Sequence, residues 1–203
     1  MAPVRVDPSK VHEFESAKRF YAWLRSHGKT EAELWIKIHK VRSGLASITP
    51  AEAIDAALCW GWIDGIRKSF DEQSFLQRYT PRGKKSIWSQ VNVANVARLI
   101  EEKKMQPAGL AQVDAAKADG RWDAAYRIKA SKAPPDLLAA IGASPKAASM
   151  YETLSAQNRF ALTFRTLGMK TEAGRTKKIA SFVAMLERGE TIHPKGRGAR
   201  QPR

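Results

Sequence analysis

Residues 62–80 constrain the fold of this chain more than any other stretch, because they predict two strands that follow one another closely. The segments 62–70 and 74–80 are rich in aromatic and β-branched residues, and three polar residues separate them. Gly65 falls inside the first segment, where glycine usually marks a bend or a bulge. A further strand is predicted over residues 33–39, where apolar side chains recur at every second position.

Helices are predicted around these strands from the spacing of apolar residues and from capping residues. The clearest start is Thr49-Pro50-Ala51-Glu52, where threonine caps the helix, proline fits the first turn and glutamate completes a capping box. In the helix predicted over 156–167, Phe160, Phe164 and Leu167 are expected to face inward. The other predicted helices cover residues 16–27, the stretch after Ser89, 110–118, 136–141, 145–153 and 172–188.

These elements predict an α+β protein with a small antiparallel sheet packed with helices, followed by a C-terminal helical bundle. The sheet domain is expected at residues 15–128 and the bundle at 136–188. Residues 129–135 have the composition of a linker, with two prolines. Residues 1–14 are expected to be an irregular lead-in, and residues 189–203 a disordered basic tail.

The charge of the chain indicates the kind of partner it favours. Lys and Arg number 35 against 20 Asp and Glu, which gives a net charge of +15. A positive field of this size attracts polyanions such as nucleic acid, an anionic membrane surface or an acidic protein. The alternative is that the charge serves solubility alone.

The sequence predicts neither a metal site nor a cofactor. Its one cysteine, Cys59, excludes an internal disulfide and is expected to be a buried thiol. The four histidines are scattered without zinc-like spacing, and no phosphate-binding glycine motif is present. There is no apolar run long enough to span a membrane, and the N-terminus lacks a secretory signal. The chain is therefore expected to be cytoplasmic.

A candidate binding site lies in the strand pair and the loop that follows it. A carboxylate and guanidinium groups beside tryptophans suit a small-molecule pocket, with Asp64 as a base or Arg67 as an anion clamp. The alternative is a structural ion pair with aromatic residues in the core, and no nucleophile–base pair is evident. The candidate residues are Trp62, Asp64, Arg67, Arg82 and Trp88.

Nucleic-acid binding is a second interpretation, because aromatic and basic residues interleave in this stretch. A basic run follows near the C-terminus, where residues 165–203 hold ten Lys or Arg and three acidic residues. For nucleic-acid binding, the candidate phosphate-binding residues are Lys84 and Lys85 in the first stretch and Arg175, Lys177 and Lys178 in the basic run. A solvated helix face would have the same composition.

Residues 51–92, 107–126, 151–160 and 175–190 resemble the YdeI/OmpD-associated family, also called bacteriocin-protection proteins. One departure is Gly174, in a segment where family members tend to carry Glu-Thr-Arg, and it is expected to weaken the start of a helix. The resemblance implies a bacterial stress-resistance role and association with a porin, but no established reaction. The leading hypothesis is a non-catalytic binding or stress-tolerance protein; nucleic-acid binding and a small-molecule enzyme with a pocket around Asp64 and Arg67 are the alternatives.

Overall fold

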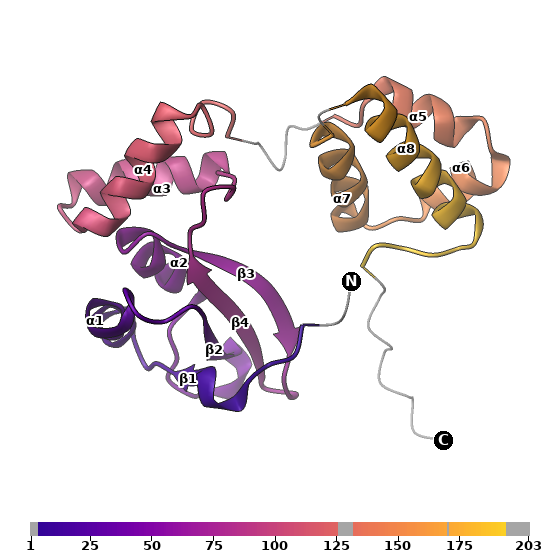
Figure 1. The fold of residues 1–203 in the computed structure, drawn as a ribbon. Coiled ribbons are helices and arrows are strands. Elements are labelled where there is room, and N and C mark those ends of the chain that lie inside the picture. Colours follow the sequence, from indigo (N-terminus) through magenta and orange to yellow (C-terminus); the bar gives the residue numbers. More distant parts are fainter. Residues whose placement is uncertain (1–3, 126–131, 170, 194–203) are drawn as a thin grey trace, which may run out of the picture. The chain divides into compact units, whose positions relative to one another are not determined.

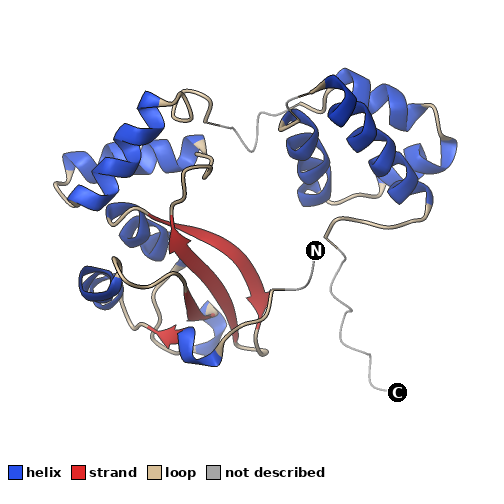
Figure 2. Ribbon diagram, viewed as in Figure 1, coloured by secondary structure: helices blue, strands red, loops and turns tan. Residues whose placement is uncertain are grey.

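The computed structural model describes residues 4–125, 132–169 and 171–193 of the chain (Figure 1). The chain divides into two compact units, residues 1–126 and 127–203, each of which is described by itself. The described part of the first unit combines a sheet with helices, and that of the second is helical (Figure 2). The predicted α+β fold with C-terminal helices is therefore confirmed.

The sheet has four strands in the order β1-β2-β4-β3. Their bounds are β1 Val11–Glu13, β2 Leu34–His39, β3 Trp62–Ser69 and β4 Ser74–Pro81. β4 pairs antiparallel with both β2 and β3, whereas β1 pairs parallel with β2, so the sheet is mixed rather than wholly antiparallel. The sequence predicts an irregular segment over 1–14 and misses β1, because three residues are too few to show an alternating pattern.

The β3–β4 hairpin contains the bulge that the sequence predicts at Gly65. The pairing register shifts between Asp64 and Arg67. Asp64 pairs with Tyr79 and Arg67 pairs with Gln77, and residues two apart on β4 share a face of the sheet. The bulge therefore places Arg67 on the same face as Asp64, where a regular strand would place Ile66.

Two helices cover one face of the sheet and build the first core. These are α1 (Ala17–His27) and α2 (Pro50–Cys59), and α2 starts with the predicted capping box between Thr49 and Glu52. Their apolar sides pack on Leu34, Ile36 and Ile38 of β2. A second cluster around Trp88 joins α2 to α3 (Gln90–Glu101) and α4 (Pro107–Ala118). Two single 3₁₀ turns, Pro8–Lys10 and Val41–Ser43, complete this unit.

The second unit packs four described helices around its own core. They are α5 (Pro135–Gly142), α6 (Pro145–Glu152), α7 (Ala156–Leu167) and α8 (Glu172–Glu187). Thr171 caps α8 by accepting a hydrogen bond from the backbone N–H of Gly174. A Cβ at position 174 would lie 2.9 Å from that hydroxyl, so glycine makes room for the cap at a position expected to weaken the helix.

The inward face of α7 differs from the prediction. Leu162 and Thr166 are buried, whereas Leu167 is 52% exposed. Phe160 and Phe164 are half-buried and stack on each other, with ring centroids 5.5 Å apart. The spacing of the aromatic residues thus predicts the helix correctly, but it does not predict which side of the helix is buried in the core.

The first residues of the predicted C-terminal tail are folded against the second unit. Asn158 accepts a hydrogen bond from the backbone N–H of His193 and donates one to its carbonyl oxygen. Residues 194–203 of the predicted tail and 129–131 of the predicted linker lie outside the described residues. Each helix in the described ranges is too short or too polar to span a lipid bilayer.

Candidate functional site

Asp64 and Arg67 belong to a polar cluster on the core-facing side of the β3–β4 hairpin. The guanidinium of Arg67 donates a hydrogen bond to the side-chain oxygen of Gln77 at 2.9 Å and lies 4.3 Å from the centroid of the Phe75 ring. Gln77 in turn donates to the carbonyl oxygen of Gly65 at the bulge. Arg67 is therefore held by Gln77 and Phe75 rather than by an ion pair with Asp64.

Asp64 is a half-buried carboxyl group with a shifted pKa. Burial raises its pKa above the ordinary aspartate value, although the charges of Arg82 and Arg67 act in the opposite direction. Tyr79, which faces Asp64 across the hairpin, is fully buried, and burial raises the pKa of its phenol. Its hydroxyl has no hydrogen-bond partner among the described residues. A carboxyl group with a raised pKa beside a buried phenol is an arrangement found in proton-transfer sites, but also in structural hydrogen-bond networks.

Trp62, Arg82 and Trp88 lie inside the protein. Their exposed fractions are 1%, 5% and 2%. The indole N–H of Trp62 donates to the carbonyl oxygen of Gly28 at 3.1 Å, and the guanidinium of Arg82 lies 3.6 Å from the centroid of the Trp88 ring. These contacts make the three side chains part of the packing, whereas Asp64 is half-buried and Arg67 is exposed.

The candidate phosphate-binding residues are placed differently from one another. Lys84 and Lys85 are exposed in a tight turn that the Ser86 hydroxyl closes by accepting a hydrogen bond from the Gly83 N–H. Arg175 instead forms a bidentate ion pair with Asp136, at 2.6 and 2.9 Å.

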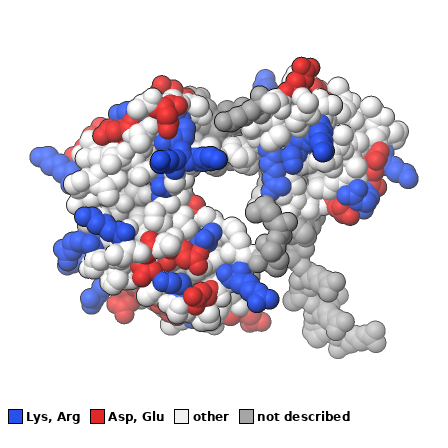
Figure 3. Space-filling model, in the orientation of Figure 1, with Lys and Arg blue, Asp and Glu red and all other residues white. Residues whose placement is uncertain are grey.

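The two lysines that follow Arg175 differ in their surroundings. Lys177 is exposed, and the ammonium of Lys178 lies 5.6 Å from the centroid of the Phe182 ring. Lys and Arg side chains are visible on the surface of both units (Figure 3).

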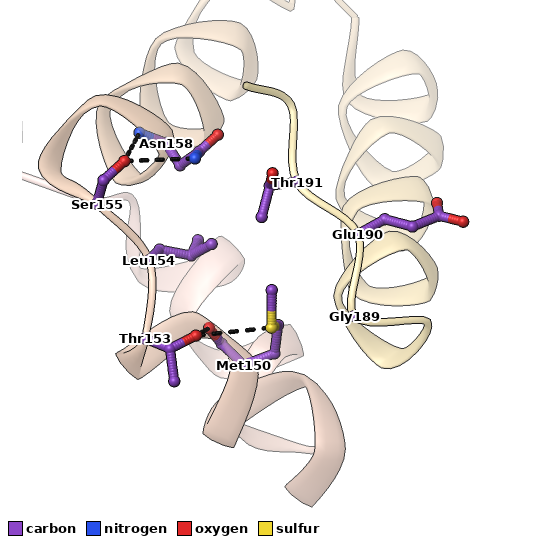
Figure 4. Close-up of a pocket in the computed structure, with 8 residues that line it drawn as sticks. All are labelled: Met150, Thr153, Leu154, Ser155, Asn158, Gly189, Glu190 and Thr191. Atoms are coloured by element: carbon purple, nitrogen blue, oxygen red, sulfur yellow. Dashed lines mark hydrogen bonds between the residues drawn. The ribbon is translucent and has the colours of Figure 1, made fainter. Parts of the chain in front are cut away.

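A cavity of about 580 Å³ lies in the second unit, at the join between α6 and α7 (Figure 4). The side chains of Met150, Leu154 and Thr191 point into it, whereas the Glu190 carboxylate points away. The cavity is therefore suited to an uncharged group. This cavity is not predictable from sequence patterns, because one of its walls is residues 189–191, which the composition predicts to be part of a disordered tail.

A second cavity of about 410 Å³ lies in the first unit between α1, α2 and the end of α3. Neither cavity includes Asp64 or Arg67 in its lining. In the described ranges, no group of three or more His, Cys, Asp or Glu side chains is arranged to hold a metal ion.

Two family models match separate parts of the chain. Residues 12–112 match a domain of unknown function, DUF8412, and residues 130–189 match the model described as bacteriocin-protection, YdeI or OmpD-associated. No curated protein and no solved structure matches the chain.

Proposed function

Because residues 130–189 are a domain of the bacteriocin-protection, YdeI or OmpD-associated family, we propose that the chain is a non-catalytic binding or stress-tolerance protein of that type. We further propose that it acts in the cytoplasm and that its partner is a polyanion, with nucleic acid as the first candidate. The observation that carries this proposal is the uneven charge of the two units. The second unit holds 15 Lys or Arg and five Asp or Glu in residues 127–203, a net charge of +10, and the first holds +5.

Most of the described Lys and Arg side chains of the second unit form no ion pair with another described residue. Of its eight described Lys and Arg residues, Arg175 and Arg188 form ion pairs. The other six have no ion pair with a described residue, and Lys146, Arg165 and Lys177 are exposed among them. Phosphates can neutralise such side chains with release of counterions, which makes the affinity depend steeply on salt.

The test is fluorescence anisotropy of the full chain with labelled random duplex DNA and single-stranded RNA, at about 50 and 200 mM salt. The variant K146Q/R165Q/K177Q removes three charges from the second unit, and R19Q/R25Q/K29Q removes three exposed charges from the first. We expect the first variant to lower the slope of log affinity against log salt by about two to three, and the second to lower it by less.

Equal losses in the two variants would mean a response to net charge alone, and would contradict a binding surface in the second unit. Tight binding of poly-L-glutamate without binding of nucleic acid would assign an acidic protein as the partner. Absence of binding to all three polymers would overturn the proposal.

A small-molecule enzyme is the second candidate function, favoured by the raised pKa of Asp64. It requires a cavity that brings a substrate to this carboxyl group, and the two cavities above are lined by other residues. We therefore rank it below polyanion binding.

A further inference from the structure

The cavity of the first unit is formed where three helices meet and small side chains face one another. Ala17 of α1 and Ala56 and Cys59 of α2 line it, together with Tyr21 and Leu99. Because these three side chains are short, they leave a space of about 410 Å³ that no neighbouring residue fills. This volume lies in the range of small-molecule sites.

The floor of this cavity is apolar and uncharged. Cys59 and Leu99 are 2% and 1% exposed. Burial raises the pKa of the Cys59 thiol to about 11, so the thiol stays neutral at physiological pH and is a poor nucleophile. The floor therefore suits an apolar group rather than a reacting one.

Side chains of both charges line the mouth, and one of them, Lys104, pairs with Glu102 at 2.7 Å. Lys18 lies on α1 and Lys104 beyond the end of α3, while Glu52 and Asp55 lie on successive turns of α2. Lys18 makes no ion pair or hydrogen bond with a described residue.

Both carboxylates keep an oxygen available. One oxygen of Glu52 accepts the cap bonds from Thr49, and one oxygen of Asp55 accepts from Arg98 at 2.6 Å. Among the described residues, the second oxygen of each carboxylate accepts no hydrogen bond.

The cavity wall is held in place before any ligand arrives. The Tyr21 hydroxyl donates to the carbonyl oxygen of Lys104 at 3.0 Å, and the backbone N–H of Gln106 donates to the carbonyl oxygen of Cys59 at 3.0 Å. The Tyr21 ring also packs edge-on against Trp60, with centroids 5.5 Å apart. Such preorganisation lowers the entropic cost of binding.

We propose that this cavity binds a small zwitterion of the amino-acid class with a large apolar side chain. The carboxylate of the ligand lies at the two lysines, its ammonium group at the two carboxylates of α2, and its side chain on the apolar floor. A ligand that carries both charges matches this mouth, because lysine and carboxylate side chains both line it. The inference does not depend on polyanion binding.

The experiment is isothermal titration calorimetry of the full chain with three probes that share a phenyl ring. L-phenylalanine carries both charges, 3-phenylpropionate only the carboxylate, and 2-phenylethylamine only the ammonium group. We expect L-phenylalanine to bind at least about tenfold more tightly than either analogue, a difference of about 1.4 kcal/mol. The proposal would be overturned if either analogue bound as tightly as L-phenylalanine. It would also be overturned if L-phenylalanine showed no binding up to about 10 mM.

Two variants locate the site. Ala17→Leu fills the cavity and should reduce L-phenylalanine affinity at least tenfold, whereas Ala51→Leu on the exposed start of α2 should not. Lys18→Gln should weaken L-phenylalanine but not 2-phenylethylamine, with Arg19→Gln as its control.

Circular dichroism checks that each variant is folded. Unchanged affinity in both Ala17→Leu and Lys18→Gln would place the binding elsewhere and contradict the inference.

Discussion

Lys103 adopts a backbone conformation that lysine rarely takes. Its φ is 55°, and it follows Glu102, the residue that caps the end of α3. Its N–H bonds to the carbonyl oxygen of Ile100, and the next N–H bonds to that of Leu99. This is the helix-ending motif in which glycine is usual, because a Cβ is strained in the left-handed region. This left-handed conformation turns the chain after α3, and the carbonyl oxygen of the next residue, Lys104, accepts a hydrogen bond from the Tyr21 hydroxyl.

Replacing Lys103 by glycine should therefore stabilise the protein by about 1 kcal/mol, since glycine adopts this conformation without strain. The measurement is the free energy of unfolding from urea denaturation. Lys103→Ala is the control, which keeps the Cβ and should change stability little. A destabilised glycine variant would show that the side chain of Lys103 has a role that outweighs the strain.

Arg82 is a cation held in the packing by an aromatic ring. Its guanidinium lies 3.6 Å from the Trp88 centroid and donates to the carbonyl oxygen of Ile87 at 3.2 Å. Lysine cannot reproduce a planar stacked group, so Arg82→Lys should destabilise the protein by about 1–2 kcal/mol. Thermal unfolding checks this, with Lys85→Arg in the exposed turn as the neutral control. An equal response in the two variants would contradict a packing role for Arg82.

The sequence identified unusual residues in the hairpin but could not tell which of them are buried. Tryptophans beside arginines look the same at a binding surface and in a core, because both settings favour stacking. Trp62, Arg82 and Trp88 are buried in the structure. Arg67 lies on the same face of the sheet as Asp64 because of the bulge at Gly65. Register shifts of this kind depend on neighbouring strands that a local pattern does not reveal.

At the scale of elements, α2 and α4 approach so closely that a side chain is excluded between them. A Cβ on Gly109 would lie 2.3 Å from the carbonyl oxygen of Cys59 and 2.7 Å from that of Leu58. Gly109→Ala must force the helices apart and should cost about 2–3 kcal/mol, despite the higher helix propensity of alanine.

Chemical denaturation measures this loss, and Gly65→Ala is the matched control. A Cβ at Gly65 would meet its nearest neighbour, the carbonyl oxygen of Arg78, at 3.7 Å, which is ordinary contact. Similar stability changes for the two alanine variants would show that the α2–α4 contact relaxes without penalty.

The ion pair between Asp136 and Arg175 fastens the start of α5 to α8. The hydrogen bond from Arg175 holds the pKa of Asp136 below its ordinary value. A lowered pKa means stability that is present at neutral pH and lost as the pH falls through the folded-state pKa. Asp136→Asn should therefore destabilise the protein at pH 7, and the difference from the parent should shrink as the pH falls below about 4 toward the lowered folded-state pKa. Thermal unfolding from pH 7 to about pH 2 is the measurement, with Glu172→Gln as the control; a difference that does not shrink as the pH falls would contradict the ion-pair explanation.

Most element boundaries were predictable because they depend on local signals. Thr49, Ser89, Ser144, Ser155 and Thr171 all cap helices through side-chain bonds to the backbone. The parallel pairing of β1 was not predictable, because it joins short segments that α1 separates. The buried face of α7 was also missed, since Phe160 and Phe164 satisfy part of their packing against each other.

For the molecule as a whole, the proposed polyanion binding depends on Lys and Arg rather than on histidine. The chain has 35 Lys and Arg and four His. Lys and Arg side chains ordinarily keep their charge to about pH 10, so affinity for duplex DNA should change less than about twofold between pH 6 and 8.5. Anisotropy titrations at fixed salt check this. A steep loss of affinity above pH 6.5 would instead identify histidine as a contact.

The edge position of β3 has a consequence for self-association. Its outer side pairs with no strand of the described sheet, and such an edge is a template for adding strands from other copies. The bulge at Gly65 bends this edge and so hinders regular pairing with a strand of another copy. The hairpin that carries the candidate site therefore also opposes fibril formation. Deleting Gly65 would straighten the edge and remove part of that protection.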